Sequence, residues 1–209
     1  SKDLWKIEFV KNKKRKFITC NNVFLCCGSI ENLKILKDNN LVKKNNKICF
    51  HPMIKVIVKF PEKVNKKNME ILTHQLTQFF PDFLAGSAAS GLPFLKISAQ
   101  HDEKLYSDVI QNWENMLIFH STFSIGKGKV IKVPFVKEPI VYFQINKNEI
   151  NLIKKGLEKL CKLLIDADCD YIYPIAKKSQ KLNKLNYKNY IDKIKTVTDL
   201  NYSTVHILG

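Results

Sequence analysis

Residues 22–36, NVFLCCGSIENLKIL, decide how the rest of the chain is read. Val23 to Cys27 is an apolar run of strand length, Gly28-Ser29 interrupts it, and residues 30–36 carry apolar side chains at helical spacing. We expect Ser29 to cap this helix by accepting a hydrogen bond from an amide of the first turn. The pattern predicts a strand buried on both faces that turns on glycine into a helix, as in α/β folds. Such turns present free amides to anionic cofactors, although a strand–turn–helix without any ligand fits the same pattern.

The chain of 209 residues is long enough for one domain, or two small ones, with a substantial core. Its 45% hydrophobic and 26% charged residues are typical of a folded globular protein. No apolar run approaches the roughly 20 residues of a membrane-spanning helix, and the N-terminus lacks the apolar centre of a secretion signal. We therefore expect no membrane span and a cytoplasmic location.

The net charge of +16 raises the question of nucleic-acid binding. All but one of the 35 basic residues are lysine, and Arg15 is the single arginine. Arginine is favoured for bidentate recognition of phosphates and bases, so its near absence argues against a specific nucleic-acid partner. A non-catalytic basic module that binds an anionic partner stays open as an alternative function.

The six cysteines contain no CxxC pair and the five histidines are scattered, so we expect no metal site. We interpret the cysteines as free thiols in the interior of a protein from a reducing compartment. They are Cys20, Cys26, Cys27, Cys49, Cys161 and Cys169.

Periodicity and turn residues predict the remaining elements. Residues 5–10 and 16–19 flank a polar turn and predict a hairpin, and residues 53–60 predict an alternating strand that His51-Pro52 opens. The clearest helix spans residues 148–167, with one apolar stripe opposite lysines. Further expectations are helices at 104–115 and 187–194, strands at 116–125, 140–145 and 171–173, and a strand-like end at HILG (206–209). A turn is expected at GKGK (126–129), from which residues 130–133 pair back as a hairpin.

Four stretches, in this order, resemble the glucose–methanol–choline (GMC) family of FAD-dependent alcohol oxidoreductases. Residues 27–36, CGSIENLKIL, are similar to the family's turn after a flavin-domain strand, with Lys34 in place of arginine. Residues 50–52, FHP, resemble the motif that opens its substrate-domain strands. Residues 128–174 are similar to its Gly-basic-Val strand, Pro-x-x-x-Tyr strand, long helix and closing strand. Residues 203–209, STVHILG, resemble the segment with its principal active-site histidine.

The resemblance implies FAD as cofactor and transfer of a hydride from an alcohol or sugar CH–OH group to the flavin. It implies that His206 is the base or hydrogen-bond partner of the substrate hydroxyl, that Gly28 and Ser29 lie near the flavin, and that His51 lies close to the domain junction. Histidine titrates near neutral pH, which suits removal of a hydroxyl proton. Without the resemblance, a lone histidine in a strand is more typical of a structural role.

Two parts of the family pattern are absent from the sequence: the GxGxxG dinucleotide fingerprint and the later segment with a second catalytic His or Asn. The resemblance therefore implies a fragment. Residues 1–46 would belong to an FAD-binding domain, residues 47–199 would form the substrate-binding domain, and residues 200–209 would return to the FAD domain. The remainder of the flavin domain would be the partner of this chain, which alone would be incomplete as an enzyme; an inactive remnant stays open as well.

The expected fold class is α+β, with an antiparallel or mixed sheet covered on one face by the helix at 148–167 and its neighbours. The identity of the substrate and of the electron acceptor has no readable signal in the sequence.

Overall fold

The computed structural model describes residues 4–42, 48–66, 74–131, 133, 135, 140–176 and 179–208, with only the backbone for residues 204–208. The chain divides into two compact units, residues 1–46 and residues 47–208. Residues 202–208, which the resemblance assigned to the first domain, form a strand of the second unit. Each unit is described here by itself.

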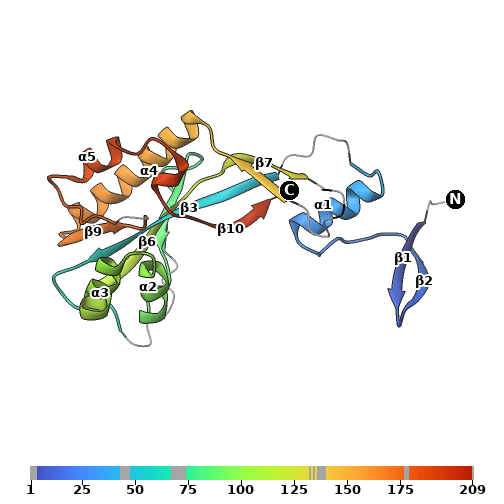
Figure 1. Cartoon of the computed structure of the whole chain (residues 1–209), viewed down its shortest axis with the longest axis horizontal. Helices are drawn as coiled ribbons and strands as arrows, with labels where there is room; N and C mark the ends of the chain where they lie inside the picture. The colour runs from blue at the N-terminus through green and yellow to red at the C-terminus, as the bar shows by residue number, and fades with distance from the viewer. Residues whose placement is uncertain are drawn as a thin grey trace. The chain divides into compact units, whose positions relative to one another are not determined.

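A β-hairpin and one helix make up the described part of the first unit (Figure 1). Strands β1 (Trp5–Lys11) and β2 (Lys14–Cys20) pair antiparallel around Asn12 and Lys13, whose φ angles are +52° and +60°. Two consecutive residues with positive φ are the turn that matches the twist of a hairpin. Helix α1 (Ser29–Asp38) follows. The hairpin and the helix were both predicted from the sequence, and both predictions are confirmed.

The predicted buried strand at residues 23–27 is wrong. Residues 22–26 have no regular structure, and Phe24 is 87% exposed. An apolar run becomes a buried strand only where strands flank it and other layers cover its faces. Within the described residues no strand pairs with this run, so its apolar composition has no matching environment.

The second unit is built around the long strand β3 (Ile48–Lys59), at the centre of an eight-stranded sheet in the described part of the chain. Strands β6 (Met116–Thr122) and β7 (Ile125–Ile131) follow one another along one side of β3. Strands β9 (Tyr171–Pro174) and β10 (Tyr202–Leu208) line the other side. Beyond β6 lie β5 (Leu84–Ser87) and β4 (Gln75–Leu76), and beyond β7 lies β8 (Ile140–Gln144). All of these pairs are antiparallel, so the α+β class is confirmed.

Helices cover both faces of this sheet, which corrects the expectation of a single covered face (Figure 1). Helices α4 (Lys147–Asp166) and α5 (Tyr187–Asp192) pack on one face, and α2 (Leu92–Ala99) and α3 (Glu103–Asn112) pack on the other. Val56 and Val58 contribute to the first core and Ile57 to the second. Three consecutive buried apolar residues in one strand require a layer on each face, because side chains alternate across the sheet.

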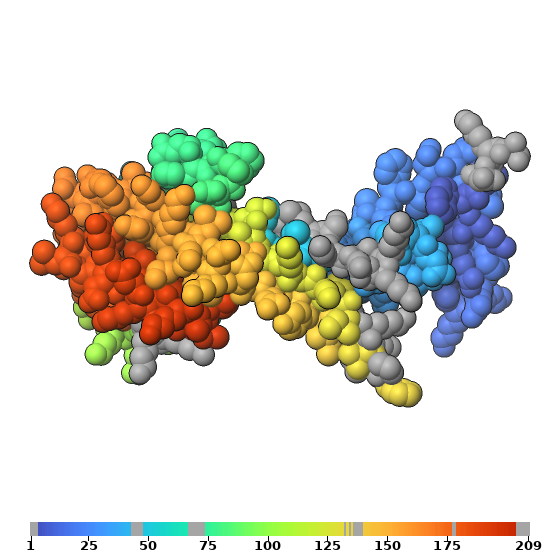
Figure 2. All heavy atoms as spheres, turned by 90° about the horizontal axis from the view of Figure 1, so that it is seen from above, coloured from blue at the N-terminus to red at the C-terminus, as the bar shows by residue number. Residues whose placement is uncertain are grey.

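The long helix α4 confirms the prediction for residues 148–167. Asn146 and Glu149 form a capping box in which the Asn146 side chain accepts from the Glu149 amide and the Glu149 side chain accepts from the Asn146 amide. The buried stripe of α4 consists of Ile153, Gly156, Leu157, Leu160, Cys161 and Leu164. Figure 2 shows the atoms of α4 and α5 packed together along one side of the second unit.

The predicted turn at GKGK and the hairpin after it are wrong, because residues 126–129 lie within strand β7. The chain turns instead at residues 123–124, and β7 pairs with β3 and β8. The glycines have a packing role. A Cβ on Gly126 would lie 2.1 Å from the Phe143 ring, and one on Gly128 would lie 2.4 Å from the Phe50 ring. Here glycine makes room for aromatic rings stacked on the strand.

All six cysteines are free thiols, but the expectation that they lie in the interior holds only in part. Cys161 is buried and Cys20 and Cys169 are half-buried. The other three, Cys26, Cys27 and Cys49, are exposed. Cys26 and Cys27 are exposed for the same reason as Phe24, since they belong to the run that forms no strand.

Candidate functional site

Strand β10 carries a bulge where it passes His51. Thr204 pairs with Pro52 and Ile207 pairs with Phe50, so residues 205 and 206 together lie opposite His51. The topology thus brings together the backbones of two expected site residues, His51 and His206, from distant parts of the sequence. A bulge bends its strand and re-aims the side chains next to it, and bulges are over-represented beside active sites. His51 is half-buried, and the side chain of His206 lies outside the described residues.

Gly28 and Ser29 belong to the first unit, where they begin α1. Gly28 takes the cap position with φ +83°, which favours glycine, and Ser29 is the first helical residue. The expected Ser29 cap is therefore wrong. The Asn32 side chain holds the turn instead, accepting from the Cys27 amide at 2.9 Å and donating to the Leu25 carbonyl at 2.9 Å.

These residues do not make a complete dinucleotide site. A Cβ at Gly28 would meet nothing within 4 Å, so a ligand could approach the backbone there. The neighbouring Cys27 amide, however, already donates to Asn32, and the sequence holds no GxGxxG turn to receive a pyrophosphate. The described part of this chain therefore does not by itself hold the complete flavin site that the resemblance implies.

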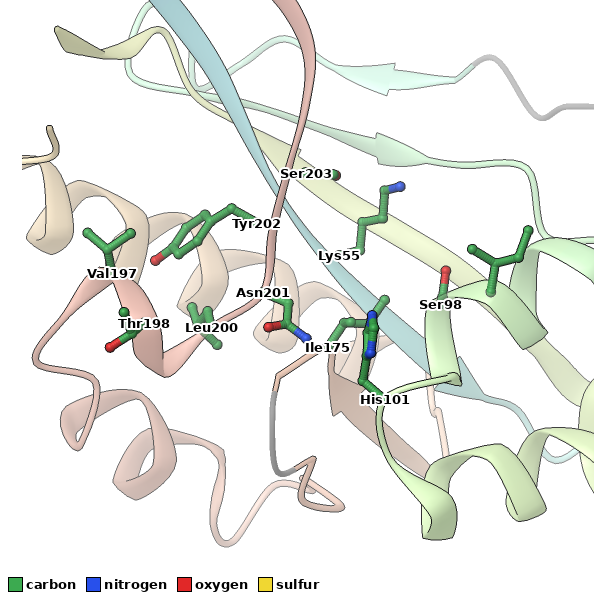
Figure 3. Close-up of a pocket in the computed structure, with 11 residues that line it drawn as sticks. Lys55, Ser98, His101, Ile175, Val197, Thr198, Leu200, Asn201, Tyr202 and Ser203 are labelled. Carbon is green, nitrogen blue, oxygen red and sulfur yellow. The ribbon is translucent and has the colours of Figure 1, made fainter. Parts of the chain in front are cut away.

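An open cleft of about 830 Å³ lies on the α2 face of the second unit. Clefts of this size are typical of small-molecule sites. It is bounded by the end of α2, by Lys55 of β3, by Ile175 after β9, and by the segment from the short helix η2 (Val197–Asp199) into β10 (Figure 3). Its lining residues are Lys55, Ile97, Ser98, His101, Ile175, Val197, Thr198, Leu200, Asn201, Tyr202 and Ser203.

Strand alternation and pairing explain why polar groups gather at one end of the cleft. Lys55 stands between Ile54 and Val56, which both point into the α4 core, so Lys55 points to the opposite face. Ser203 pairs with Met53 and therefore lies on the same face as Lys55. In Figure 3, Lys55 rises from the sheet between Ser203 of β10 and Ser98 of α2.

His120 is the cross-strand neighbour of Lys55, and it is buried at 7% exposure. Burial lowers its pKa below the usual range, and the charge of Lys55 lowers it further, so the imidazole is held neutral. Its Nδ1 atom has no hydrogen-bond partner among the described residues. At this part of the face, Lys55 therefore carries a positive charge and His120 is neutral.

A second polar cluster joins α3 to β9. Asp108 accepts hydrogen bonds from Tyr171 at 2.9 Å and from Tyr173 at 3.0 Å, and Lys181 lies 3.0 Å from its carboxylate. Burial alone would raise the pKa of Asp108, but these partners lower it below its usual range. Burial and Asp108 in turn raise the pKa values of both tyrosines. Because every member of the cluster is satisfied, we assign it a structural role, in anchoring Lys181 to α3.

Three comparisons with known proteins add no relative. No family model, curated protein or solved structure matches the chain.

Within the described ranges, no group of three or more His, Cys, Asp or Glu side chains could hold a metal ion. A search of the same residues finds no helix that is both long enough and apolar enough to cross a bilayer.

The cleft was not predicted from the sequence, and neither were its residues Lys55, Ser98 and Ser203. One signal was present: Lys55 interrupts an otherwise apolar stretch of β3, IKVIV. Because lysine is rarely fully buried, its place in such a stretch indicates an opening in the layer that covers the strand. No comparable signal marks Ser98 or Ser203, because α2 and β10 come to β3 only through the tertiary fold.

Proposed function

We propose that this chain forms the substrate-binding part of a flavin-dependent oxidoreductase that transfers a hydride from an alcohol or sugar CH–OH group to FAD. Four sequence stretches that resemble the GMC family support the proposal. The observation that carries it is the bulge of β10, which sets residues 205 and 206 against His51. Two separate motifs of the resemblance thus meet at one position of the sheet.

In this proposal His206 holds the substrate hydroxyl and accepts its proton. Loss of that proton raises the electron density on the oxygen, so the hydride leaves the adjacent carbon more readily. A histidine base suits this step because imidazole titrates near neutral pH. His51 shares a face of β3 with Lys55, four residues away, since side chains on one face recur at every second residue. The reacting end of a substrate would lie toward His51 and its remainder along the cleft.

The test uses the protein encoded by the complete reading frame, purified with its flavin and assayed for dye reduction by alcohols and sugars. Exchange of His206 for alanine is expected to lower kcat/KM about a hundredfold or more, the usual contribution of a general base, while flavin absorbance stays unchanged. His74→Ala is the matched control, because His74 is exposed and lies outside the cleft.

Unchanged turnover in His206→Ala would remove the catalytic assignment. Absence of both flavin and dye reduction in the wild-type protein would reject the oxidoreductase. If that protein instead bound heparin with a steep dependence on salt, the basic binding module would be the better description.

A further inference from the structure

We propose that the cleft between α2, β3 and β10 binds an amphipathic acid, with Lys55 as the cationic anchor of a carboxylate or phosphate group and the apolar wall against a hydrocarbon chain. As a ligand site this inference stands on the cleft itself; as a statement of substrate class it rests on the proposed function.

The first argument is the charge of the cleft. None of its eleven lining residues is acidic. Within the described part of the chain, no acidic group pairs with Lys55, whereas Lys59 on the same strand pairs with Asp170. Two acids adjoin lining residues in the sequence, Asp199 and Asp102. Asp199 accepts from the amides of Lys195 and Thr196, and Asp102 accepts from the amides of Leu105 and Ser179, so both carboxylates already bind backbone groups. Lys55 is half-buried as a residue, and a lysine in such a place without a counter-ion attracts an anionic ligand.

The second argument is the set of hydrogen-bonding groups beside Lys55. The Ser203 hydroxyl is shielded from solvent and has no partner among the described residues. Ser98 reaches the cleft from α2, and Asn201 reaches it from the segment before β10 (Figure 3). Buried polar groups are nearly always satisfied, so an unsatisfied hydroxyl beside a cation indicates where a ligand oxygen would bind.

The third argument is the opposite character of the remaining wall. Ile97, Ile175, Val197 and Leu200 line the cleft, and Ile175 and Leu200 are buried in the fold. The backbone there is fixed, because the Ile175 amide donates to the Lys55 carbonyl and the Asn201 amide donates to the Ile175 carbonyl, each at 3.0 Å. Pockets with an apolar wall and a few placed polar groups bind ligands of matching amphipathic shape.

The distance along β3 narrows the substrate class. His51 and Lys55 are four residues apart on one face, which is about 13 Å at the usual strand rise. If the hydroxyl of the substrate reacts near His51, several carbon atoms must separate it from an acid held at Lys55. The geometry therefore points to a hydroxy acid with an extended chain rather than a cationic or a compact neutral alcohol.

Calorimetric titration at constant ionic strength tests the binding, with three probes of similar length: hydroxyhexanoate, hexyl phosphate and hexanediol. We expect at least one acid to bind saturably and at least about tenfold more tightly than the diol, as a charge-assisted hydrogen bond provides. A preference for hydroxyhexanoate identifies a carboxylate ligand, and a preference for hexyl phosphate identifies a phosphate ligand.

Two charge-matched variants separate the site from general attraction by a basic protein. Lys55→Met is expected to weaken acid binding about tenfold or more, and Lys55→Arg to keep most of it. Lys127→Met removes the same charge from an exposed position on β7 outside the cleft, so it should leave the affinity unchanged. The comparison of acids with the diol uses the wild-type chain and does not depend on any variant.

Equal affinity for acid and diol, equal losses in Lys55→Met and Lys127→Met, or no saturable binding of either acid would each overturn the proposal. Oxidation of neutral alcohols alone would leave the oxidoreductase standing and reject the acidic substrate. Acid binding without any oxidation would keep the cleft as a ligand site and reject the enzyme.

Discussion

At the scale of single residues, two side chains decide the charge of this part of the α2 face. They are Lys55 and His120, at directly paired positions of β3 and β6. A lysine and a buried histidine cannot both carry a proton there without mutual repulsion in a poorly solvated place. The histidine gives up its charge, because burial and the neighbouring lysine both lower its pKa.

This lowered pKa predicts a dependence of stability on pH. An unfolded histidine has a pKa of about 6.5, so below that pH the unfolded chain takes up a proton that folded His120 resists. The free energy of unfolding is expected to be highest above pH 6.5 and to fall as the pH decreases below it. Urea unfolding at pH 7.5 and pH 5.5 measures this. His120→Asn should lose less stability over that interval than the wild type, whereas His74→Asn, at an exposed position, should behave like the wild type.

At the scale of elements, α4 combines a strong local helix signal with a constraint that its sequence does not show. Gly156 lies in the middle of the buried stripe, at a place where alanine would favour the helix by about 1 kcal/mol. A Cβ there, however, would lie 2.5 Å from the ring of Phe123, which is fully buried and packs against Phe83.

Packing should therefore outweigh helix propensity. Gly156→Ala is expected to lower the free energy of unfolding by about 1–3 kcal/mol, the usual cost of overfilling a core. Gly91→Ala is the control, because a Cβ at Gly91 meets no atom closer than 3.9 Å. A stabilising Gly156→Ala in chemical denaturation would show that the ring of Phe123 yields and that propensity decides the sign.

Local elements were predictable where neighbouring residues carry the whole signal. The hairpin turn and the stripe of α4 are of this kind. The strand at residues 53–60 was also predicted, but its alternation ends at Val56, Ile57 and Val58, which are all buried. Two predictions were wrong because they depend on residues far away in the sequence. A strand at residues 23–27 would need neighbouring strands to pair with, and the glycines of GKGK make room for the rings of Phe50 and Phe143 instead of forming a turn. The candidate site was predictable only in part. His51 and His206 were named from motifs, but the cleft at Lys55 is assembled from four separate segments.

At the scale of the whole molecule, the two units differ in how much apolar surface they bury. In the described part of residues 1–46, Leu33 is the single buried apolar residue, whereas residues 47–208 contain two cores on opposite faces of a sheet. A two-stranded hairpin is at best marginally stable without further layers. The second unit therefore holds nearly all of the packing that can stabilise the chain.

Hydrogen exchange should report this contrast. Amides of β1 and β2 are expected to exchange at least about a thousandfold faster than those of β3 in residues 53–59, because local opening of the hairpin breaks few apolar contacts. Mass spectrometry of peptides from the native chain measures both, with α4 as a second slow reference. Equal protection of β1 and β3 would mean that the hairpin shares the stability of the large core.

The basic residues on the hairpin bear on how its exposed strands associate with other copies. Trp5, Phe9 and Ile18 present apolar surface on β1 and β2, and among the described residues both outer edges of this ribbon are unpaired. Such ribbons stack readily on copies of themselves into ordered aggregates, and lysines on the strands are a common protection. Lys6, Lys11, Lys14, Arg15 and Lys16 lie along these strands against a single glutamate, Glu8. The basic residues that first suggested nucleic acid would here oppose edge-to-edge pairing of the hairpin with another copy, through mutual repulsion.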